Sequence, residues 1–396
     1  MPGIIKERIF TPGPTPLLLE AQVRALSATL HHRTEEFRRI MRETVDFLHA
    51  YFNTHNDVLI FTSSGTGAME GALSNLLSPG ERVLVGTAGK FGERWLGIAQ
   101  AYGIDVLKVE APYGETVAIA EMVERLESDG PFRAVFIQAT ESSTGVSHDV
   151  EMLATAVQRH PETCLVVDAI TGLGTTDLRP DEWGIDIMIG GSQKATMVPP
   201  GLAFASVSEK AWRIIAKSKL PRYYFDYAKE RKNLAKGESS YTPATTLVVA
   251  LHAALEYIGK LGRENLVANA AMLAEATRAA AKALGLKLFA KSRPSNAVTA
   301  ICAPTGMDSG AIVKGLRNSF GAIVSNGQGS MKGQIFRFAH LGYYDALDLF
   351  ASIAGLEVVL SKLGVAIELG SGVRAAQEVY LRRTQPRDVE QLTAAP

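Results

Sequence analysis

A regular alternation of short apolar runs with helical segments, from Val58 to Val207, restricts the possible folds more than any other feature of the chain. The runs have the length and composition of buried strands, and segments with helical periodicity separate them. Parallel strands need helical crossovers, so this order predicts an α/β fold whose mostly parallel sheet lies between helices. The expected strands are Val58–Phe61, Val83–Val85, Val106–Val109, Ala134–Gln138, Leu165–Val167, Asp186–Ile189 and Leu202–Val207.

The helices expected around this sheet complete a large unit, which we expect to span residues 18–262. Thr34 is a typical N-cap for the helix Glu35–Tyr51. Residues 1–17 include Thr11–Pro16, which is too rich in proline for a helix or a central strand, so an extended arm is expected there. The other expected helices are Ala68–Leu77, Glu93–Tyr102, Ala118–Ser128, Met152–His160 and Thr246–Ile258.

A second, smaller unit is expected over residues 263–396. Its mixed order of helices and strands predicts an α+β layer. The polar tail after Gly370 is expected to fray. The expected elements are the helices Glu264–Leu284, Ser309–Asn318 and Asp345–Leu363, and the strands Ala297–Cys302 and Ile335–Ala339.

Composition excludes several classes of function. With 396 residues and a formal net charge of +0, the chain gives no electrostatic reason to expect a nucleic-acid or membrane partner. No apolar run approaches the roughly 18 residues of a membrane span, and Met1–Phe10 lacks a signal-peptide core. Cys164 and Cys302 lie in apolar runs, which indicates buried thiols in a reducing compartment. We therefore expect a cytoplasmic protein, and no metal site is predicted.

Lys194 follows the strand Asp186–Ile189 and the pair Gly190-Gly191, at the carboxyl end of a strand where parallel sheets bind ligands. A rigid Pro-Pro-Gly turn follows, and the segment has no solvated helix face. Burial disfavours the ammonium form, so such a lysine loses proton affinity and becomes able to form a Schiff base. Taken alone, a surface lysine in a loop is the commoner explanation, so the rest of the chain has to decide.

Asp168 ends the apolar strand Leu165–Val167, so its carboxylate is expected to be buried at the same sheet edge as Lys194. A buried carboxylate needs a cationic partner, and a protonated pyridine nitrogen would serve. A helix cap, a metal ligand or an ion pair with an arginine are the alternatives.

Two further turns suit other parts of a cofactor that has an aldehyde and a pyridine ring. Ser63–Gly67 joins a strand to a helix, and backbone N–H groups at such a helix start bind phosphate. Phe91 follows the second strand, in a loop, where it could stack on a pyridine ring. Alone, the first is an ordinary strand-to-helix turn and the second an aromatic at the core edge. Together with Lys194 and Asp168, they supply the anchors that pyridoxal 5′-phosphate needs.

Arg337 lies in the apolar segment Ile335–Ala339, and no acidic residue occurs within three positions on either side. Burying an unpaired guanidinium is costly, so a partner is required. The partner is either a distant structural carboxylate or the carboxylate of a substrate.

The chain resembles the class V, fold-type I pyridoxal-phosphate aminotransferases of the alanine–glyoxylate and serine–glyoxylate group. The resemblance runs from about residue 10 to 365, with segments around Lys194 and Arg337 that are highly specific. Phe91 stands where this family often has tryptophan, and the segment Tyr223–Tyr227 is typical of a branch with varied substrates. The matching segments are Pro12–Pro16, His32–Phe37, Ser63–Gly67, Glu141–Val146, Asp168, Gly191–Ala195, Pro199–Gly201 and Phe336–Gly342.

The resemblance implies a role for each matching residue. Lys194 would form the Schiff base and carry the proton, Asp168 would pair with the pyridine nitrogen, and Phe91 and Ile170 would lie on either face of the ring. Arg337 would bind the substrate carboxylate, with Ser142 and Gly13 beside it. Thr242 would reach the phosphate of a partner subunit, which implies a homodimer with shared sites. The phosphate itself would be held by Ser64, Gly65, Thr66, Gly67 and Gln193.

By resemblance, the reaction moves an amino group from a small donor, alanine or serine, to an oxoacid such as glyoxylate or pyruvate. Arg33, Arg94 or Arg222 could bind a second carboxylate, so an aspartate or glutamate donor stays open. 2-Aminoethylphosphonate and ureidoglycine transaminases are further alternatives. A cysteine desulfurase is disfavoured because neither cysteine is placed on a loop. A non-catalytic subunit of a larger complex is disfavoured by the complete set of Lys194, Asp168 and Arg337.

Overall fold

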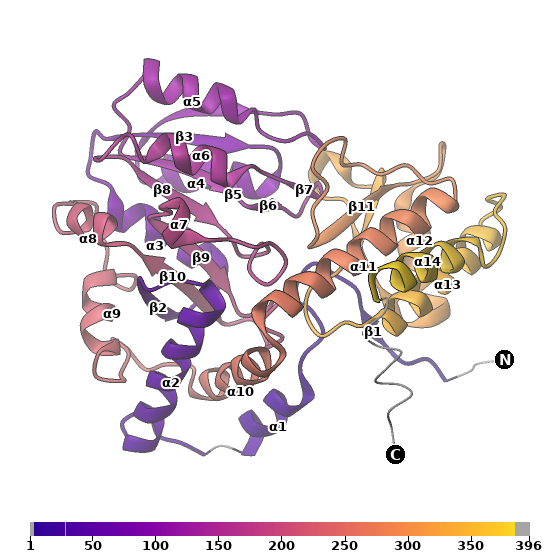
Figure 1. The fold of residues 1–396 in the computed structure, drawn as a ribbon, viewed down its shortest axis with the longest axis horizontal. Coiled ribbons are helices and arrows are strands. Elements are labelled where there is room, and N and C mark those ends of the chain that lie inside the picture. Colours follow the sequence, from indigo (N-terminus) through magenta and orange to yellow (C-terminus); the bar gives the residue numbers. More distant parts are fainter. Residues whose placement is uncertain (1–3, 28, 385–396) are drawn as a thin grey trace.

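The computed structural model describes residues 4–27 and 29–384. Its largest element is a seven-stranded sheet in the strand order β2-β10-β9-β8-β5-β3-β4 (Figure 1). The sheet is mostly parallel and lies between helices, as the alternation predicted. The strands are β2 (Asp57–Thr62), β3 (Arg82–Thr87), β4 (Asp105–Glu110), β5 (Ala134–Gln138), β8 (Cys164–Asp168), β9 (Ile187–Gly191) and β10 (Leu202–Val207).

The direction of the strands decides where a site can form. β10 is antiparallel to both β2 and β9, whereas β9, β8, β5, β3 and β4 are parallel neighbours. Because β2 pairs with β10 in the opposite sense, β2 runs in the same direction as the other five. The carboxyl ends of these six strands therefore lie at one edge of the sheet.

Helices cover this sheet, and most of their positions follow the apolar periodicity. The predicted N-cap is confirmed, because the Thr34 hydroxyl accepts a hydrogen bond from the Phe37 amide at 3.3 Å. Three short helices were not predicted from local periodicity: α7 (Pro180–Trp183), α8 (Glu209–Ile215) and α9 (Tyr227–Leu234). The other helices are α1 (Leu19–Ser27), α2 (Glu35–Phe52), α3 (Gly65–Leu76), α4 (Lys90–Ala101), α5 (Ile119–Ser128), α6 (Val150–Val157) and α10 (Thr245–Leu261).

A second, antiparallel sheet in the order β11-β14-β13 lies to one side, with the last helices around it (Figure 1). Most of its apolar side chains form clusters separate from the one around the large sheet, which Ala339 of β14 joins. The division into units after residues 17 and 262 remains a prediction. The elements are α11 (Arg263–Ala283), β11 (Val298–Cys302), α12 (Ser309–Phe320), β12 (Ala322–Ile323), β13 (Ser325–Asn326), a 3-10 turn (Gly329–Met331), β14 (Ile335–Ala339) and α13 (Ala346–Lys362).

The expected fraying after Gly370 is wrong for the described residues, since Ser371–Thr384 form helix α14. α14 buries Ala376 and Val379 against α11 and α13. Its first turn is capped from a distance. The buried Glu357 carboxylate accepts hydrogen bonds from the amides of Gly370, Gly372 and Val373 at 2.7–3.1 Å. No local sequence pattern predicts that cap. The part of the tail at residues 385–396 lies outside the described residues.

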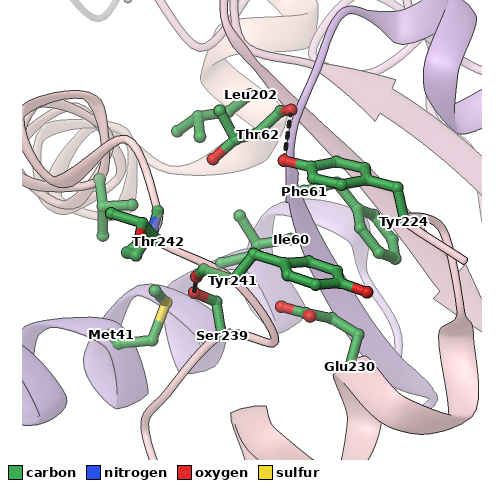
Figure 2. Close-up of a pocket in the computed structure, with 12 residues that line it drawn as sticks. Met41, Ile60, Phe61, Thr62, Leu202, Tyr224, Glu230, Ser239, Tyr241 and Thr242 are labelled. Atoms are coloured by element: carbon green, nitrogen blue, oxygen red, sulfur yellow. Dashed lines mark hydrogen bonds between the residues drawn. The ribbon is translucent and has the colours of Figure 1, made fainter. Parts of the chain in front are cut away.

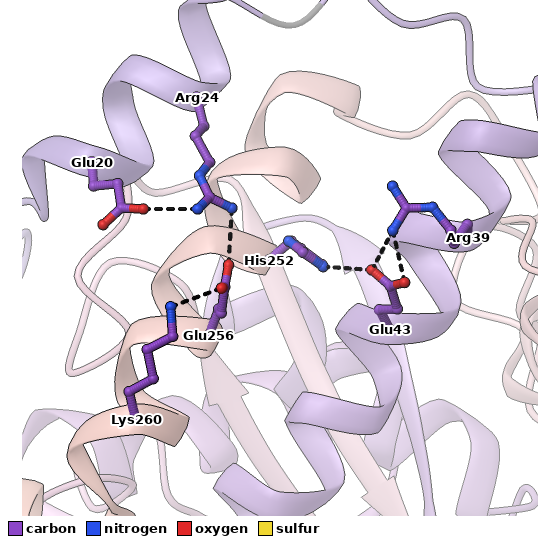
Figure 3. A network of polar contacts seen from close by, with 7 residues as sticks. All are labelled: Glu20, Arg24, Arg39, Glu43, His252, Glu256 and Lys260. Atoms are coloured by element: carbon purple, nitrogen blue, oxygen red, sulfur yellow. Dashed lines mark hydrogen bonds and ion pairs between the residues drawn. The ribbon is translucent and has the colours of Figure 1, made fainter.

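Polar contacts fasten α1 and α2 to α10 (Figure 3). Arg24 of α1 reaches Glu256 of α10 at 2.9 Å, and His252 of α10 reaches Glu43 of α2 at 2.9 Å. α1 buries Ala21 and Ala25, and its opposite face leaves an apolar strip exposed. The members of this strip are Leu19, Val23 and Leu26, which are 68%, 56% and 86% exposed. Within the described residues, no helix is both long and apolar enough to cross a membrane.

The described arm before α1 holds the short strand β1 (Arg8–Ile9) and bends at residues 11–14, so the expected extended form is met only in part. β1 pairs in parallel with β12 beside the second sheet. From there the chain passes to the carboxyl edge of the large sheet, where the Thr15 hydroxyl donates to the Lys194 carbonyl at 2.9 Å.

Candidate active site

The turns at the carboxyl edge of the large sheet bring together most of the predicted residues. β2 leads into Ser64 and α3, β3 into α4, and β5 into β6 (Thr140–Glu141) and β7 (Val146–Ser147). Asp168 ends β8, and Lys194 follows β9, whose Ile189 is the register partner of Asp168. The expectation that Lys194 and Asp168 share one sheet edge is therefore confirmed.

Lys194 is buried, with 8% of its surface exposed. Its Nζ donates to the Pro12 carbonyl at 2.5 Å, and no carboxylate within the described parts of the chain forms an ion pair with it. Burial lowers its pKa to about 8, the nearby Arg337 and Arg94 charges act in the same direction, and Asp168 opposes them. A larger fraction of this amine is thus unprotonated near neutral pH than for an ordinary lysine, and the unprotonated form is the nucleophile.

Gly13 lies directly against this amine. A Cβ built on Gly13, whose φ is +143°, would come within 2.5 Å of Lys194 Nζ. Any side chain at position 13 would displace Lys194, because the N-terminal arm packs directly against its amine.

Asp168 is also buried, at 5% exposure. Its Oδ1 accepts a hydrogen bond from the Ile170 amide at 2.9 Å, and no cation of the described residues pairs with it at ion-pair distance. Burial raises its pKa to about 6, and the negative charge of Glu141 adds to the rise. The carboxylate therefore lacks the cationic partner that it would need when ionised.

The phosphate-binding turn differs from its expected form. α3 begins at Gly65 rather than Ala68, so Gly65, Thr66 and Gly67 form its first turn. Ser64 occupies the N-cap position, but its side chain makes no capping hydrogen bond, and no acidic residue lies in the first turn. The helix start is consequently positive, with backbone N–H groups and a free hydroxyl for an anion.

Close packing explains the glycine at the start of α3. A Cβ on Gly65 would approach Ile170 Cδ1 to 2.4 Å, which leaves no room for a side chain. Gln193, just before Lys194, has a buried Oε1 with no hydrogen-bond partner among the described residues. Thr66 Oγ1 accepts a hydrogen bond from Arg94 Nη1 at 3.0 Å.

Phe91 was expected in a loop, but it lies in the first turn of α4. This helix begins at Lys90 rather than at Glu93. The Arg94 guanidinium carbon lies 4.8 Å from the centre of its ring. The helix starts early because Glu141 Oε2 accepts hydrogen bonds from the amides of Phe91 and Gly92 at 2.9 and 3.1 Å. This cap lies about fifty residues away, so local sequence patterns could not reveal it.

Arg337 in β14 connects the second sheet to this site. It is 3% exposed, and its guanidinium donates only to carbonyl oxygens: Nη1 to Ser142 at 2.9 Å and Nη2 to Asn326 at 2.8 Å. Burial lowers its pKa to about 10. No structural carboxylate pairs with it among the described residues, so the alternative of a distant ion pair is not supported.

Thr242 is exposed on the loop before α10, and Figure 2 shows it with Tyr241 and Ser239 beside a small cavity of about 20 Å³. The Ala244 amide of this loop donates to Thr62 Oγ1 at the end of β2. The contact between Thr242 and a partner subunit stays a prediction.

The three arginines considered for a second carboxylate lie in different surroundings. Arg33 lines a surface hollow together with Thr242. Arg222 donates to Ser218 Oγ and to carbonyl groups near the end of α8. Arg94 lies at the sheet edge, where its charge acts on both Lys194 and Asp168.

These residues fit pyridoxal phosphate. A buried lysine of lowered pKa, a buried carboxylate without a cation and a positive helix start converge at one edge of the sheet. Each suits a different part of this cofactor: the aldehyde, the ring nitrogen and the phosphate.

The cysteines offer no competing chemistry. Cys164 is buried in β8, and Cys302 is only half-buried at the end of β11, which differs slightly from the expected full burial. Burial raises the pKa of both thiols, the opposite of what a nucleophilic cysteine needs. No group of three or more His, Cys, Asp or Glu suited to a metal ion occurs in residues 4–27 and 29–384.

Fold and site define a transferase of the pyridoxal-phosphate-dependent type, and comparison gives its family. Residues 18–342 match the family described as "Aminotransferase class-V". The chain belongs to this family, whose members depend on pyridoxal phosphate, and it is a transaminase. The resemblance seen in the sequence is confirmed.

Similar proteins carry different names. The chain is 40% identical over 379 residues to "Soluble hydrogenase 42 kDa subunit" of Anabaena cylindrica, covering 95% of this chain and 99% of that protein. It is 38% identical to "L-aspartate--glyoxylate aminotransferase" of Paracoccus denitrificans, covering 95% and 96%. It is 35% identical to "Serine--glyoxylate aminotransferase" of Methylorubrum extorquens, covering 95% and 96%.

A solved structure supports the fold. The crystal structure of an aspartate aminotransferase from Thermus thermophilus superposes with a TM-score of 0.84 at 34% identity, covering 90% of this chain and 99% of that chain. The expected α/β architecture is confirmed.

Proposed function

We propose that this chain binds pyridoxal phosphate at the carboxyl edge of the large sheet and transfers the amino group of alanine or serine to glyoxylate or pyruvate. The observation that carries the proposal is Arg337: a buried guanidinium with no carboxylate partner, at the site of Lys194. One such arginine suits the single carboxylate of a small donor.

The cofactor would be held from several sides. Ser64, Gly65, Thr66, Gly67 and Gln193 would bind the phosphate at the start of α3. Asp168 would pair with the ring nitrogen, and Phe91 and Ile170 would cover the two faces of the ring. When bound, pyridoxal phosphate supplies an aldehyde for the amino group and a ring that accepts the electron pair left at Cα.

The chain's own groups would carry out the proton transfers. Lys194 Nζ takes the proton from the donor's Cα, as a pKa near 8 permits at neutral pH. The Asp168 carboxylate keeps a proton on the ring nitrogen. Arg337 and Ser142 orient the donor, and the Pro12 carbonyl and Gly13 close over the lysine. Water releases the first oxoacid and the amino group stays at the site, from which a second oxoacid receives it by the reverse steps.

A second candidate donor is aspartate. Arg94 pairs with no carboxylate of the described residues, lies over Phe91, and contributes a positive charge at Lys194. It is therefore suited to a second carboxylate. The Paracoccus relative named for aspartate adds weight to this candidate.

Arg337→Lys tests the carboxylate assignment. Lysine keeps the charge but loses the two-pronged geometry, so affinity for the donor should fall by about 1.5–3 kcal/mol, the scale of a charged hydrogen bond. Reaction with ethylamine, which has no carboxylate, should barely change. The measurement mixes the cofactor-loaded protein with alanine, serine, aspartate or ethylamine and follows loss of the cofactor's absorbance.

In the wild type, alanine or serine should react fastest, and faster reaction of aspartate would select the second candidate. If alanine and ethylamine lost reactivity equally in the variant, Arg337 would be structural.

The protein is further proposed to be a homodimer in which Thr242 binds the partner's phosphate. The exposed strip of Leu19, Val23 and Leu26 supports a partner surface, because isolated chains seldom expose several large apolar side chains side by side. The match of Thr242 to the family pattern supports the shared site.

Mixing two inactive variants tests this shared site. Lys194→Ala and Thr242→Glu should each be inactive, since the second places a carboxylate against a phosphate. A hybrid dimer would contain one site with both wild-type residues, so the mixture should regain activity after subunit exchange. Sedimentation should show a dimer at micromolar concentration. A fully active monomer, or hybrid dimers without activity, would refute the shared site.

A further inference from the structure

Glu141 is the most thoroughly hydrogen-bonded buried carboxylate at the site, and beyond capping α4 no part in cofactor or substrate binding has yet been given to it. It is 0% exposed at the end of β6. Its Oε2 accepts from the Phe91 and Gly92 amides at 2.9 and 3.1 Å. Its Oε1 accepts from the Ser143 amide at 3.1 Å and from the Ser143 hydroxyl at 2.5 Å.

Although burial raises the pKa of Glu141, the directions of its hydrogen bonds fit an ionised carboxylate. Three of the four partners are backbone N–H groups, which can only donate. The fourth, the Ser143 hydroxyl, already accepts from the Lys90 amide at 3.0 Å and so turns its own hydrogen toward Glu141. No ion pair to Glu141 occurs among the described residues, so its charge is held by dipoles, including the positive start of α4.

The backbone is shaped to admit this carboxylate. Gly89 occupies the N-cap position of α4 and offers no side chain to cap the helix. A Cβ on Gly89 would lie 2.6 Å from Glu141 Cδ and 2.5 Å from Ser143 Oγ. Glycine at this position therefore makes room for a cap supplied from β6.

The two oxygens hold two different walls of the site. Oε2 fixes the first turn of α4, which carries Phe91. Oε1 fixes the turn after β6, where the Ser142 carbonyl accepts from Arg337 Nη1 at 2.9 Å. A single side chain thus connects the aromatic proposed to cover the cofactor with the arginine proposed to bind the substrate.

We propose that Glu141 is a positioning residue that sets the cofactor wall at Phe91 and the carboxylate-binding wall at Arg337 in one fixed relation. The proposal rests on the function proposed above. Substrate carboxylate and cofactor ring must meet in one geometry for proton transfer from Cα, and a common anchor for both walls provides it.

Two substitutions distinguish the effect of Glu141 on cofactor binding from its effect on donor binding. Glu141→Ala removes the acceptor for both, so the Kd for pyridoxal phosphate and the KM for the amino donor should each rise roughly 10- to 100-fold, the scale of lost charged hydrogen bonds. Glu141→Gln keeps one oxygen and replaces the other with a donor. Its NH₂ group should face Ser143, where the hydroxyl can turn to accept and only one amide loses its acceptor, so the two amides of α4 keep theirs. The donor KM should then rise while the cofactor Kd changes little.

Glu357→Gln is the matched control, because Glu357 is an equally buried glutamate that caps α14 through backbone amides far from the site. It should lower the melting temperature without changing Kd or KM. Cofactor affinity is measured by fluorescence titration of the cofactor-free dimer, and folding by thermal unfolding. Wild-type Kd and KM in both Glu141 variants, or equal changes in Glu357→Gln, would overturn the proposal.

A wild-type protein that neither bound pyridoxal phosphate nor reacted with amino acids would instead refute the proposed function. If Glu141→Ala fails to fold, the split between Kd and KM in Glu141→Gln still decides, since a general loss of stability would move both together.

Discussion

Lys194→Ala is expected to abolish transamination while leaving a folded protein that still binds pyridoxal phosphate without a covalent bond. The substitution removes both the amine that would join the aldehyde and the group that would move the proton at Cα. A positioned acid–base residue contributes roughly 10²–10⁴-fold to a rate, so the loss should be at least of this order. Steady-state assays and borohydride reduction followed by mass spectrometry measure the two effects.

Added methylamine should restore part of the rate in Lys194→Ala, because a small primary amine can enter the space left by the side chain. Lys210→Ala provides the control, since Lys210 pairs with Asp186 at the opposite end of the sheet. That variant should keep both activity and labelling. Borohydride labelling of another lysine in an active Lys194→Ala protein would show that the assignment is wrong.

Asp168→Asn is expected to retain cofactor but to lose roughly 100-fold or more in the proton-transfer step. A neutral amide cannot keep the ring nitrogen protonated, and removal of one preorganised electrostatic partner typically costs a factor of this size. Donor affinity should change far less than the single-turnover rate. Wild-type single-turnover rates would rule out this role for Asp168.

The same variant should be more stable than the wild type when cofactor is absent. Burial raises the Asp168 pKa from 3.8 to about 6, so the folded state holds a proton that the unfolded state releases. Stability is therefore lost as pH rises from 3.8 to 6, by up to about 3 kcal/mol, and Asp168→Asn avoids this loss. The gain in stability of Asp168→Asn is smaller than this figure, because the variant also loses the electrostatic attraction between the Asp168 carboxylate and Lys194.

Urea unfolding of the cofactor-free proteins measures this difference, which should be present at pH 8 and absent below pH 4. Asp186→Asn is the control: this buried carboxylate lies at the amino end of β9 and pairs with Lys210. It should lose stability and keep the single-turnover rate. Equal stability of Asp168→Asn and wild type at pH 8 would contradict a raised pKa for the buried Asp168 carboxylate.

The seven strands of the large sheet, its mostly parallel arrangement and the meeting of Lys194 with Asp168 were all predictable from the sequence. Strand identity depends on local composition, and strand-to-helix alternation forces neighbouring strands into parallel directions. The carboxyl ends of these strands must then lie at one edge. A residue that follows such a strand is placed without knowledge of the strand order.

The hydrogen-bond partners of the buried polar groups are visible only in the folded chain. The early starts of α3 and α4 and the existence of α14 depend on packing and on caps from residues distant in sequence, above all Glu141 and Glu357. The antiparallel insertion of β10 and the Pro12 contact to Lys194 likewise join distant parts of the chain. Local periodicity records which side chains are apolar, but hydrogen bonds between distant residues leave no periodic signal, so they appear only when the chain has folded.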